Sequence, residues 1–98
     1  MSELELYTYI FEFRGGTYSS QVYAENLNLS VEKWIEKITE EKNEIKYLGK
    51  NTIKDLKLQV DNNVDSPTKL KGLKNIWYFR LTSKQGVLSI NIIKTSII

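Results

Sequence analysis

The chain has 98 residues, of which 41% are hydrophobic and 27% charged, and its formal net charge is +2. This length suits one domain that buries roughly 65% of its unfolded surface, so we expect a single domain over residues 1–98. The chain contains no cysteine and no histidine, which excludes disulfides, thiolate metal sites and histidine-based catalysis or zinc binding. Its start resembles no signal peptide and no apolar run is long enough to cross a membrane, so we expect a cytoplasmic protein.

The first predicted element is a β-hairpin between residues 7 and 24, with its turn at Gly15-Gly16. A glycine pair supplies the positive φ angles of a two-residue turn, and this turn sets Phe13 opposite Tyr18. One face of the hairpin is then aromatic and aliphatic, and the other is mostly polar. This alternation is typical of an antiparallel sheet with one face in contact with water.

The next predicted element is a helix that begins at Ser30, its N-cap, and ends near Lys42. Apolar residues recur with helical spacing and form one stripe, which consists of Val31, Trp34, Ile35 and Ile38. Like charges lie four residues apart on the opposite face, so the helix gains most of its stability by docking the stripe on the sheet.

Two further strands are predicted at residues 44–48 and 52–61, the second because apolar and polar residues alternate from Leu56 to Val60. Residues 61–69 have no apolar rhythm and are predicted to form a surface loop, the one stretch long enough to suggest a functional role.

The last third of the chain is predicted to be a second hairpin with Phe79 opposite Ile92, connected by a two-residue turn at Gln85-Gly86 or by a four-residue loop in the same register. Its apolar face consists of Trp77, Phe79, Leu81, Leu88, Ile90 and Ile92. Together the elements predict an α+β fold in the order β-β-α-β-(β)-β-β. The expected architecture is a mostly antiparallel sheet of five or six strands with one amphipathic helix packed on one face.

The charges are distributed unevenly: residues 1–41 hold eight acidic and three basic residues, and residues 42–98 hold four and eleven. The densest basic segment contains Lys69, Lys71 and Lys74. Lysines can neutralise phosphates while bases stack on tyrosines, so nucleic-acid binding through these lysines and Arg80 is one alternative. It is disfavoured because the chain has only two arginines and lacks the RNA-recognition signature.

A small enzyme that uses only carboxylates is a second alternative. The carboxylate pair Glu40-Glu41 lies at a predicted helix end, where water keeps both groups ionised, so we expect no catalytic activity and no cofactor. The segment that begins at Asp61 starts like a calcium loop. However, Ser66 stands where that loop needs glycine and Gly72 where it needs glutamate, so we expect no metal site.

Apolar and aromatic residues on the face opposite the predicted core give the strongest functional indication. They are Ile10, Tyr23, Tyr78 and Ile93, with Arg80 among them. Tyrosine and arginine are enriched in binding hot spots, and the apolar chain end could pair along a sheet edge or contact another subunit. The alternative is that residues 61–74 fold over this face and cover it.

We therefore expect a non-enzymatic protein-binding module of the inhibitor, immunity-like or adaptor kind, which binds a protein partner or a second copy of itself. The candidate binding residues are Tyr23, Tyr78, Arg80 and Ile93, with Lys69, Lys71 and Lys74 for the nucleic-acid alternative. No motif is specific enough to indicate a family, because many small proteins share such a fold.

Overall fold

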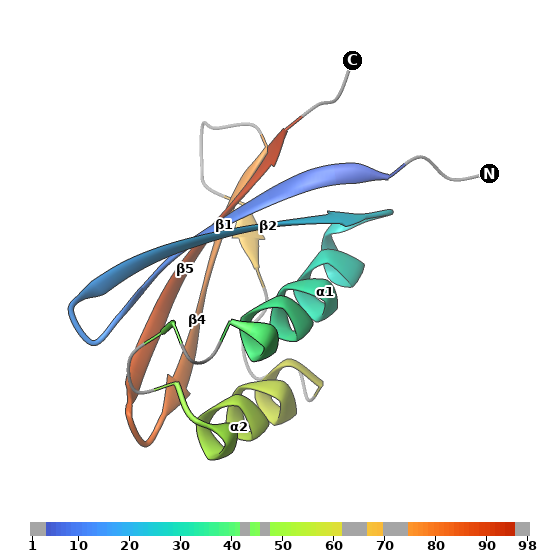
Figure 1. Ribbon diagram of the computed structural model, residues 1–98. Helices are drawn as coiled ribbons and strands as arrows, with labels where there is room; N and C mark the ends of the chain where they lie inside the picture. The colour runs from blue at the N-terminus through green and yellow to red at the C-terminus, as the bar shows by residue number, and fades with distance from the viewer. Residues whose placement is uncertain (1–3, 42–43, 46–47, 62–66, 70–74, 96–98) are drawn as a thin grey trace.

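The computed structural model describes residues 4–41, 44–45, 48–61, 67–69 and 75–95. Its elements are β1 (Glu5–Phe13), β2 (Gly16–Ala24), α1 (Leu27–Glu40), α2 (Lys50–Asp61), β3 (Thr68–Lys69), β4 (Ile76–Ser83) and β5 (Gly86–Thr95). The strands form an antiparallel sheet in the spatial order β2-β1-β5-β4-β3. Figure 1 shows α1 and α2 on the same face of this sheet. The predicted α+β class and antiparallel sheet are confirmed, whereas the single predicted helix is wrong because the described residues contain two.

The first hairpin turns at Arg14-Gly15, one residue before the predicted turn. Phe13 pairs with Gly16, so the predicted pairing of Phe13 with Tyr18 is wrong by two residues. A shift of two residues leaves every side chain on its predicted face, because side chains alternate between faces with a period of two. The φ angles of Arg14 and Gly15 are 49° and 82°, as expected for a type I′ turn.

The positive φ of Arg14 is unusual for a residue with a side chain, and a contact between the two hairpins accounts for it. Its guanidinium Nη1 donates a hydrogen bond to the carbonyl oxygen of Gln85, 2.7 Å away in the second hairpin turn. Gly16 has a different role, because a Cβ there would lie 2.6 Å from the Tyr18 hydroxyl oxygen. Gly16 is therefore the first residue of β2, and the absence of a side chain leaves room for the Tyr18 ring.

The second hairpin turns at Lys84-Gln85, also one residue before the predicted position. Phe79 pairs with Ile90 instead of Ile92, and the shift is again two residues, so the faces are those predicted. The apolar face is confirmed: Phe79, Leu81, Leu88, Ile90 and Ile92 are buried, and Trp77 is half-buried against the core.

Helix α1 begins one turn earlier than predicted, because Asn26 and not Ser30 is its N-cap. The Asn26 side chain accepts a hydrogen bond from the backbone N–H of Leu29 over 2.9 Å. Ser30 lies inside the helix and is fully buried. The helix ends at Glu40, with Glu41 as C-cap, two residues before the predicted end. The predicted apolar stripe is confirmed, since Val31, Trp34, Ile35 and Ile38 are all buried.

The predicted strand 52–61 is wrong, because these residues belong to α2. Thr52, Ile53 and Leu56 are buried and Val60 packs against the core, which is the spacing of one helix face. Leu58, which a strand would place beside Leu56, is 51% exposed. The six residues of alternating polarity thus fit the period of a strand and that of a helix. The segment is a helix because its apolar face packs against β4.

The described residues of the predicted strand 44–48 are not in a strand, although Ile45 and Leu48 are buried. The predicted loop 61–69 is partly wrong: Thr68–Lys69 form β3, which pairs with β4. Residues 62–66 lie outside the described residues.

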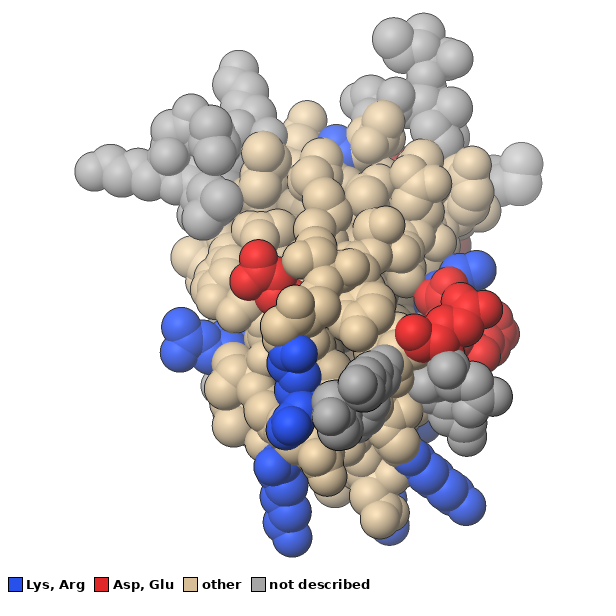
Figure 2. Space-filling model, turned by 60° about the vertical axis from the view of Figure 1, so that its left-hand side comes forward, with Lys and Arg blue, Asp and Glu red and all other residues tan. Residues whose placement is uncertain are grey.

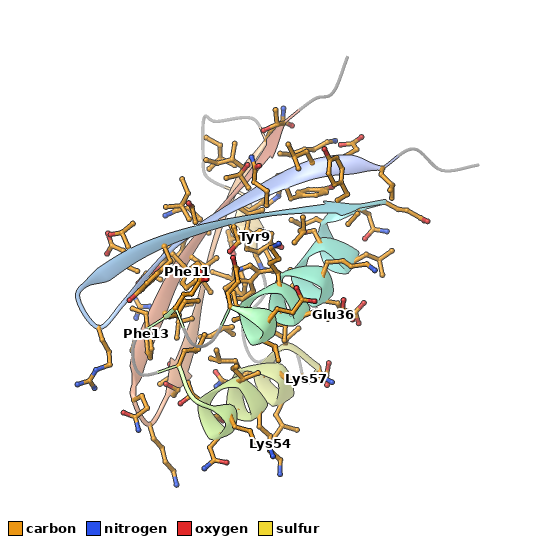
Figure 3. All side chains as sticks on the ribbon, in the orientation of Figure 1. Tyr9, Phe11, Phe13, Glu36, Lys54 and Lys57 are labelled. Carbon is orange, nitrogen blue, oxygen red and sulfur yellow. The ribbon has the colours of Figure 1, made fainter. Side chains whose placement is uncertain are left out.

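The Trp34 side chain is the centre of the core, and it is fully buried. Its indole stacks on the Tyr9 ring at 5.1 Å between centroids and meets the edges of Phe11 at 5.4 Å and Phe79 at 6.0 Å. Figure 3 shows the side chains of Tyr9, Phe11 and Phe13 of β1 on the side of the sheet that carries the helices. One side chain of α1 thereby contacts both hairpins.

A buried polar contact fixes the position of α1 on the sheet. The Tyr9 and Ser30 hydroxyl oxygens are 2.7 Å apart, and the Ser30 hydroxyl donates to the carbonyl oxygen of Leu27 over 2.6 Å. Serine has one hydroxyl hydrogen, so Tyr9 is the donor in the first bond. Burial raises the pKa of the Tyr9 phenol, and it also raises that of Tyr7.

Replacing Trp34 with alanine should lower the free energy of unfolding by about 3–5 kcal/mol, since a fully buried indole would leave a cavity. Trp34→Phe should cost less, because it keeps a ring in the core and removes an indole N–H that has no acceptor among the described residues. Urea unfolding followed by far-UV circular dichroism measures both variants. The control is Leu58→Ala on the exposed side of α2, which should change stability by about 0.5 kcal/mol or less. An equal loss for Leu58→Ala and Trp34→Ala would contradict this packing.

Stability should fall as the pH rises above 10, the ordinary pKa of tyrosine. Because burial raises the pKa of Tyr9 in the folded state, the unfolded chain releases this proton first, and deprotonation favours unfolding. The Tyr9 contribution is therefore complete below pH 10 and is lost as the pH approaches the folded-state value. Urea midpoints measured across this range should fall less steeply for Tyr9→Phe, with Tyr7 retaining part of the slope. An unchanged slope in Tyr9→Phe would refute the assignment, and exposed Tyr23→Phe is the control.

Candidate functional site

The candidate site is the face of the sheet that carries neither α1 nor α2, called the outer face below (Figure 1). Alternate residues of the four long strands point to it. They are Leu6, Thr8, Ile10 and Glu12 of β1, Thr17, Ser19, Gln21 and Tyr23 of β2, Ile76, Tyr78, Arg80 and Thr82 of β4, and Val87, Ser89, Asn91, Ile93 and Thr95 of β5. Most of these side chains are uncharged. Figure 2 shows a mainly uncharged surface on the side where the β1–β2 turn lies, with Lys and Arg side chains projecting along its lower margin.

The sheet register brings three of the four predicted binding residues together. Tyr78 pairs with Asn91, which pairs in turn with Ile10 on β1. Arg80 pairs with Ser89, and Ile93 pairs with Ile76. These two pairs flank the pair of Tyr78 and Asn91 on the same face of the sheet. The three residues therefore share one patch on β4 and β5.

Tyr23 lies apart from that patch, near the end of β2. It pairs with Leu6, which pairs with Thr95, so two strands and one row of outer-face residues lie between Tyr23 and Tyr78. Its ring is 55% exposed, and Ile10, between Tyr23 and the patch, is 36% exposed. Tyr78 and Ile93 are half-buried, and Arg80 is exposed. Of these residues, the exposed apolar ones are therefore Tyr23 and Ile10, whereas the patch on β4 and β5 exposes mainly Arg80.

Val87 is a member of this face that the sequence did not single out. It is 43% exposed at the second hairpin, beside the pair formed by Glu12 and Ser89. The alternation of polar and apolar residues in β5 could have placed Val87 on this face. A hollow of about 350 Å³ lined by Val87, Ser89, Glu12 and Arg14 extends the face toward the first hairpin turn.

Of residues 61–74, which the alternative expects to cover this face, Asp61 and residues 67–69 are described. Asp61 ends α2 on the opposite face, and Thr68–Lys69 extend the sheet sideways at the edge of β4. Thr68 pairs with Tyr78 and so lies beside it in the sheet. The described part of this segment therefore does not lie across the outer face.

Of the lysines proposed for nucleic-acid binding, only the backbone of Lys69 lies within the described residues. Lys69 is in β3 opposite Trp77, its side chain lies outside the described residues, and so do Lys71 and Lys74. Lys54 and Lys57 are on α2, on the helical side of the sheet (Figure 3). The register of β4 with β5 puts Arg80 on the outer face. The described cations are thus divided between the two faces.

A cleft of about 640 Å³ between α1 and α2 was missed, because α2 was predicted as a strand. Ile35, Val60 and Lys57 line it together with acidic residues from both helices: Glu32, Glu36, Glu40 and Asp61. All four carboxylates are exposed to water. Within the described ranges, no group of three or more acidic residues has the geometry to hold a metal ion.

The helices in the described part of the chain are too short or too polar to span a membrane. Comparisons with protein-family models, with curated proteins and with solved structures find no match to this chain. Its function must therefore be argued from its own surface.

Proposed function

We propose that the chain is a protein-binding module that docks a partner protein on the outer face and catalyses no reaction. The observation that carries the proposal is the contrast between the two faces of the sheet. Both helices pack on one face, while the other keeps Ile10, Tyr23 and Val87 exposed. Apolar side chains that remain in contact with water on one face of a sheet favour association with another surface.

The residue types of the outer face indicate what kind of partner it suits. Tyr78, Arg80 and Tyr23 are of the types that contribute most binding energy in protein interfaces, and serine and threonine fill the space between them. Such a surface suits a folded partner with an apolar patch and hydrogen-bonding groups at its margin. An inhibitor, immunity or adaptor protein would use a face of this kind.

Nucleic-acid binding is the first alternative. It requires cations on one continuous surface, because affinity for phosphates depends on neutralising several of them together. Among the described residues, Arg80 is on the outer face, and the side chains of Lys69, Lys71 and Lys74, on which this alternative also rests, lie outside them. Salt-dependent binding to an oligonucleotide in a fluorescence-anisotropy titration would favour this alternative over protein binding.

A carboxylate-only enzyme is the second alternative, and the cleft between α1 and α2 would be its site. A general acid needs a carboxyl group withdrawn from water, whereas Glu36, Glu40 and Asp61 are all exposed. The cleft therefore ranks below the outer face as a functional site.

The outer-face variants Ile10→Ser and Tyr23→Ser should each weaken partner binding about tenfold or more, since truncating a hot-spot residue costs about 1–2 kcal/mol or more. Both side chains are exposed, so the variants should fold normally. The immobilised chain is used to capture proteins from its native cell, and the captured partner is titrated against each variant by calorimetry. The matched control is Leu58→Ser, because Leu58 is equally exposed on the helical side.

Loss of binding in Leu58→Ser together with full binding in Ile10→Ser and Tyr23→Ser would refute the outer face and point to the helical side. Equal binding by all three variants would refute a contact at either position.

A further inference from the structure

The free edge of β2 exposes a row of backbone hydrogen-bonding groups. In a two-residue hairpin the residues that flank the turn, here Phe13 and Gly16, exchange both hydrogen bonds, and alternate pairs then do the same. The backbone N–H and C=O groups of Thr17, Ser19, Gln21 and Tyr23 consequently point away from β1. Within the described residues, no backbone group pairs with them.

On the other side of the sheet, the β4 edge is covered at two positions. At one end of β4, Tyr78 pairs with Thr68 of β3. At the other end, the Gln59 side chain of α2 accepts from the Thr82 N–H over 3.0 Å and donates to the Thr82 carbonyl oxygen, as a neighbouring strand would. The fold thus protects one edge and leaves the β2 edge open.

β2 also lacks the features with which natural edge strands avoid pairing. Its nine residues include no charge and no proline, and its register with β1 is unbroken over nine pairs, so it contains no bulge. Long, regular, uncharged edges are templates for another strand. This edge is therefore suited to an additional strand that is itself uncharged.

We propose that the additional strand is β2 of a second copy of this chain, paired antiparallel around a two-fold axis at Gln21. The outward groups then meet in three pairs, with Ser19 opposite Tyr23, Gln21 opposite Gln21 and Tyr23 opposite Ser19. Each pair exchanges two hydrogen bonds, which gives about six in total. The two outer faces become one continuous surface. This inference concerns a different surface from the proposed function and does not depend on it.

The charges beside the edge favour a second copy over an unrelated strand. Lys33, Glu36, Lys37 and Glu40 of α1 line a hollow of about 220 Å³ with Gln21, Val22 and Tyr23 of β2. Their signs alternate along the helix. A two-fold rotation reverses the order, so the Lys33 end of one α1 lies beside the Glu40 end of the other.

The same charges select the position of the axis. Ser20 donates a hydrogen bond to Glu41 over 2.9 Å, so an axis at Ser20 would place two Glu41 carboxylates opposite each other. With the axis at Gln21, Ser20 faces Val22 of the other copy, and Glu41 approaches the side of α1 that carries Lys37. An axis at Val22 would leave only two outward pairs within β2, because the strand ends at Ala24.

Single cysteines test this register without interference, because the chain has none of its own. Gln21→Cys should form a disulfide-linked dimer under mild oxidation, since paired Cα atoms lie about 5.5 Å apart, within reach of a disulfide. Ser19→Cys and Tyr23→Cys should each stay monomeric on a reducing-agent-free gel, because their like positions lie about 13 Å apart. A mixture of these two proteins should cross-link.

Light scattering of the unmodified chain at micromolar concentrations should give the mass of a dimer. Gln21→Lys should convert it to a monomer, since two ammonium groups would face each other across the axis. The control is Thr82→Lys on the β4 edge, which should remain a dimer. A monomeric unmodified chain, or equal cross-linking of Gln21→Cys and Thr17→Cys, would overturn the proposal. Either result would leave partner binding by Ile10 and Tyr23 unaffected, so the two proposals fail separately.

Discussion

The contact of Trp34 with both hairpins is the constraint on which the rest of the structure depends. Its indole stacks on Tyr9 of β1 and meets Phe79 of β4, so one helix residue contacts strands on both sides of β5. The hydrogen bond between Tyr9 and Ser30 fixes the same helix along the strand direction. Because α1 and α2 both pack on this face, Ile10, Tyr23 and Val87 on the opposite face stay exposed among the described residues.

The sequence predicted faces correctly and registers incorrectly, for a physical reason. Hydrophobic alternation determines only which face of the sheet a side chain points to. This was sufficient to place Tyr78, Arg80 and Ile93 on the outer face. The register of each hairpin depends on its turn. In the first hairpin, the hydrogen bond from Arg14 to the Gln85 carbonyl oxygen accompanies a positive φ at Arg14. A glycine pair in the sequence does not reveal such a contact between hairpins.

The α2 helix could not be predicted, because its apolar residues fit both a strand and a helix and the packing partners lie elsewhere in the chain. That error hid the cleft between the helices and the bond between Gln59 and Thr82. The sheet therefore has two unlike edges and two unlike faces. The β4 edge and the inner face are covered by described elements, whereas the β2 edge and the outer face are the surfaces that we propose for association.

Hydroxyl-radical footprinting of the isolated chain, read by mass spectrometry, tests this two-sided architecture most directly. The account predicts rapid oxidation of Tyr23 and protection of Tyr9 and Trp34, which are fully buried. Oxidation of Trp34 as fast as that of Tyr23 would contradict it, because α1 would then not cover the sheet.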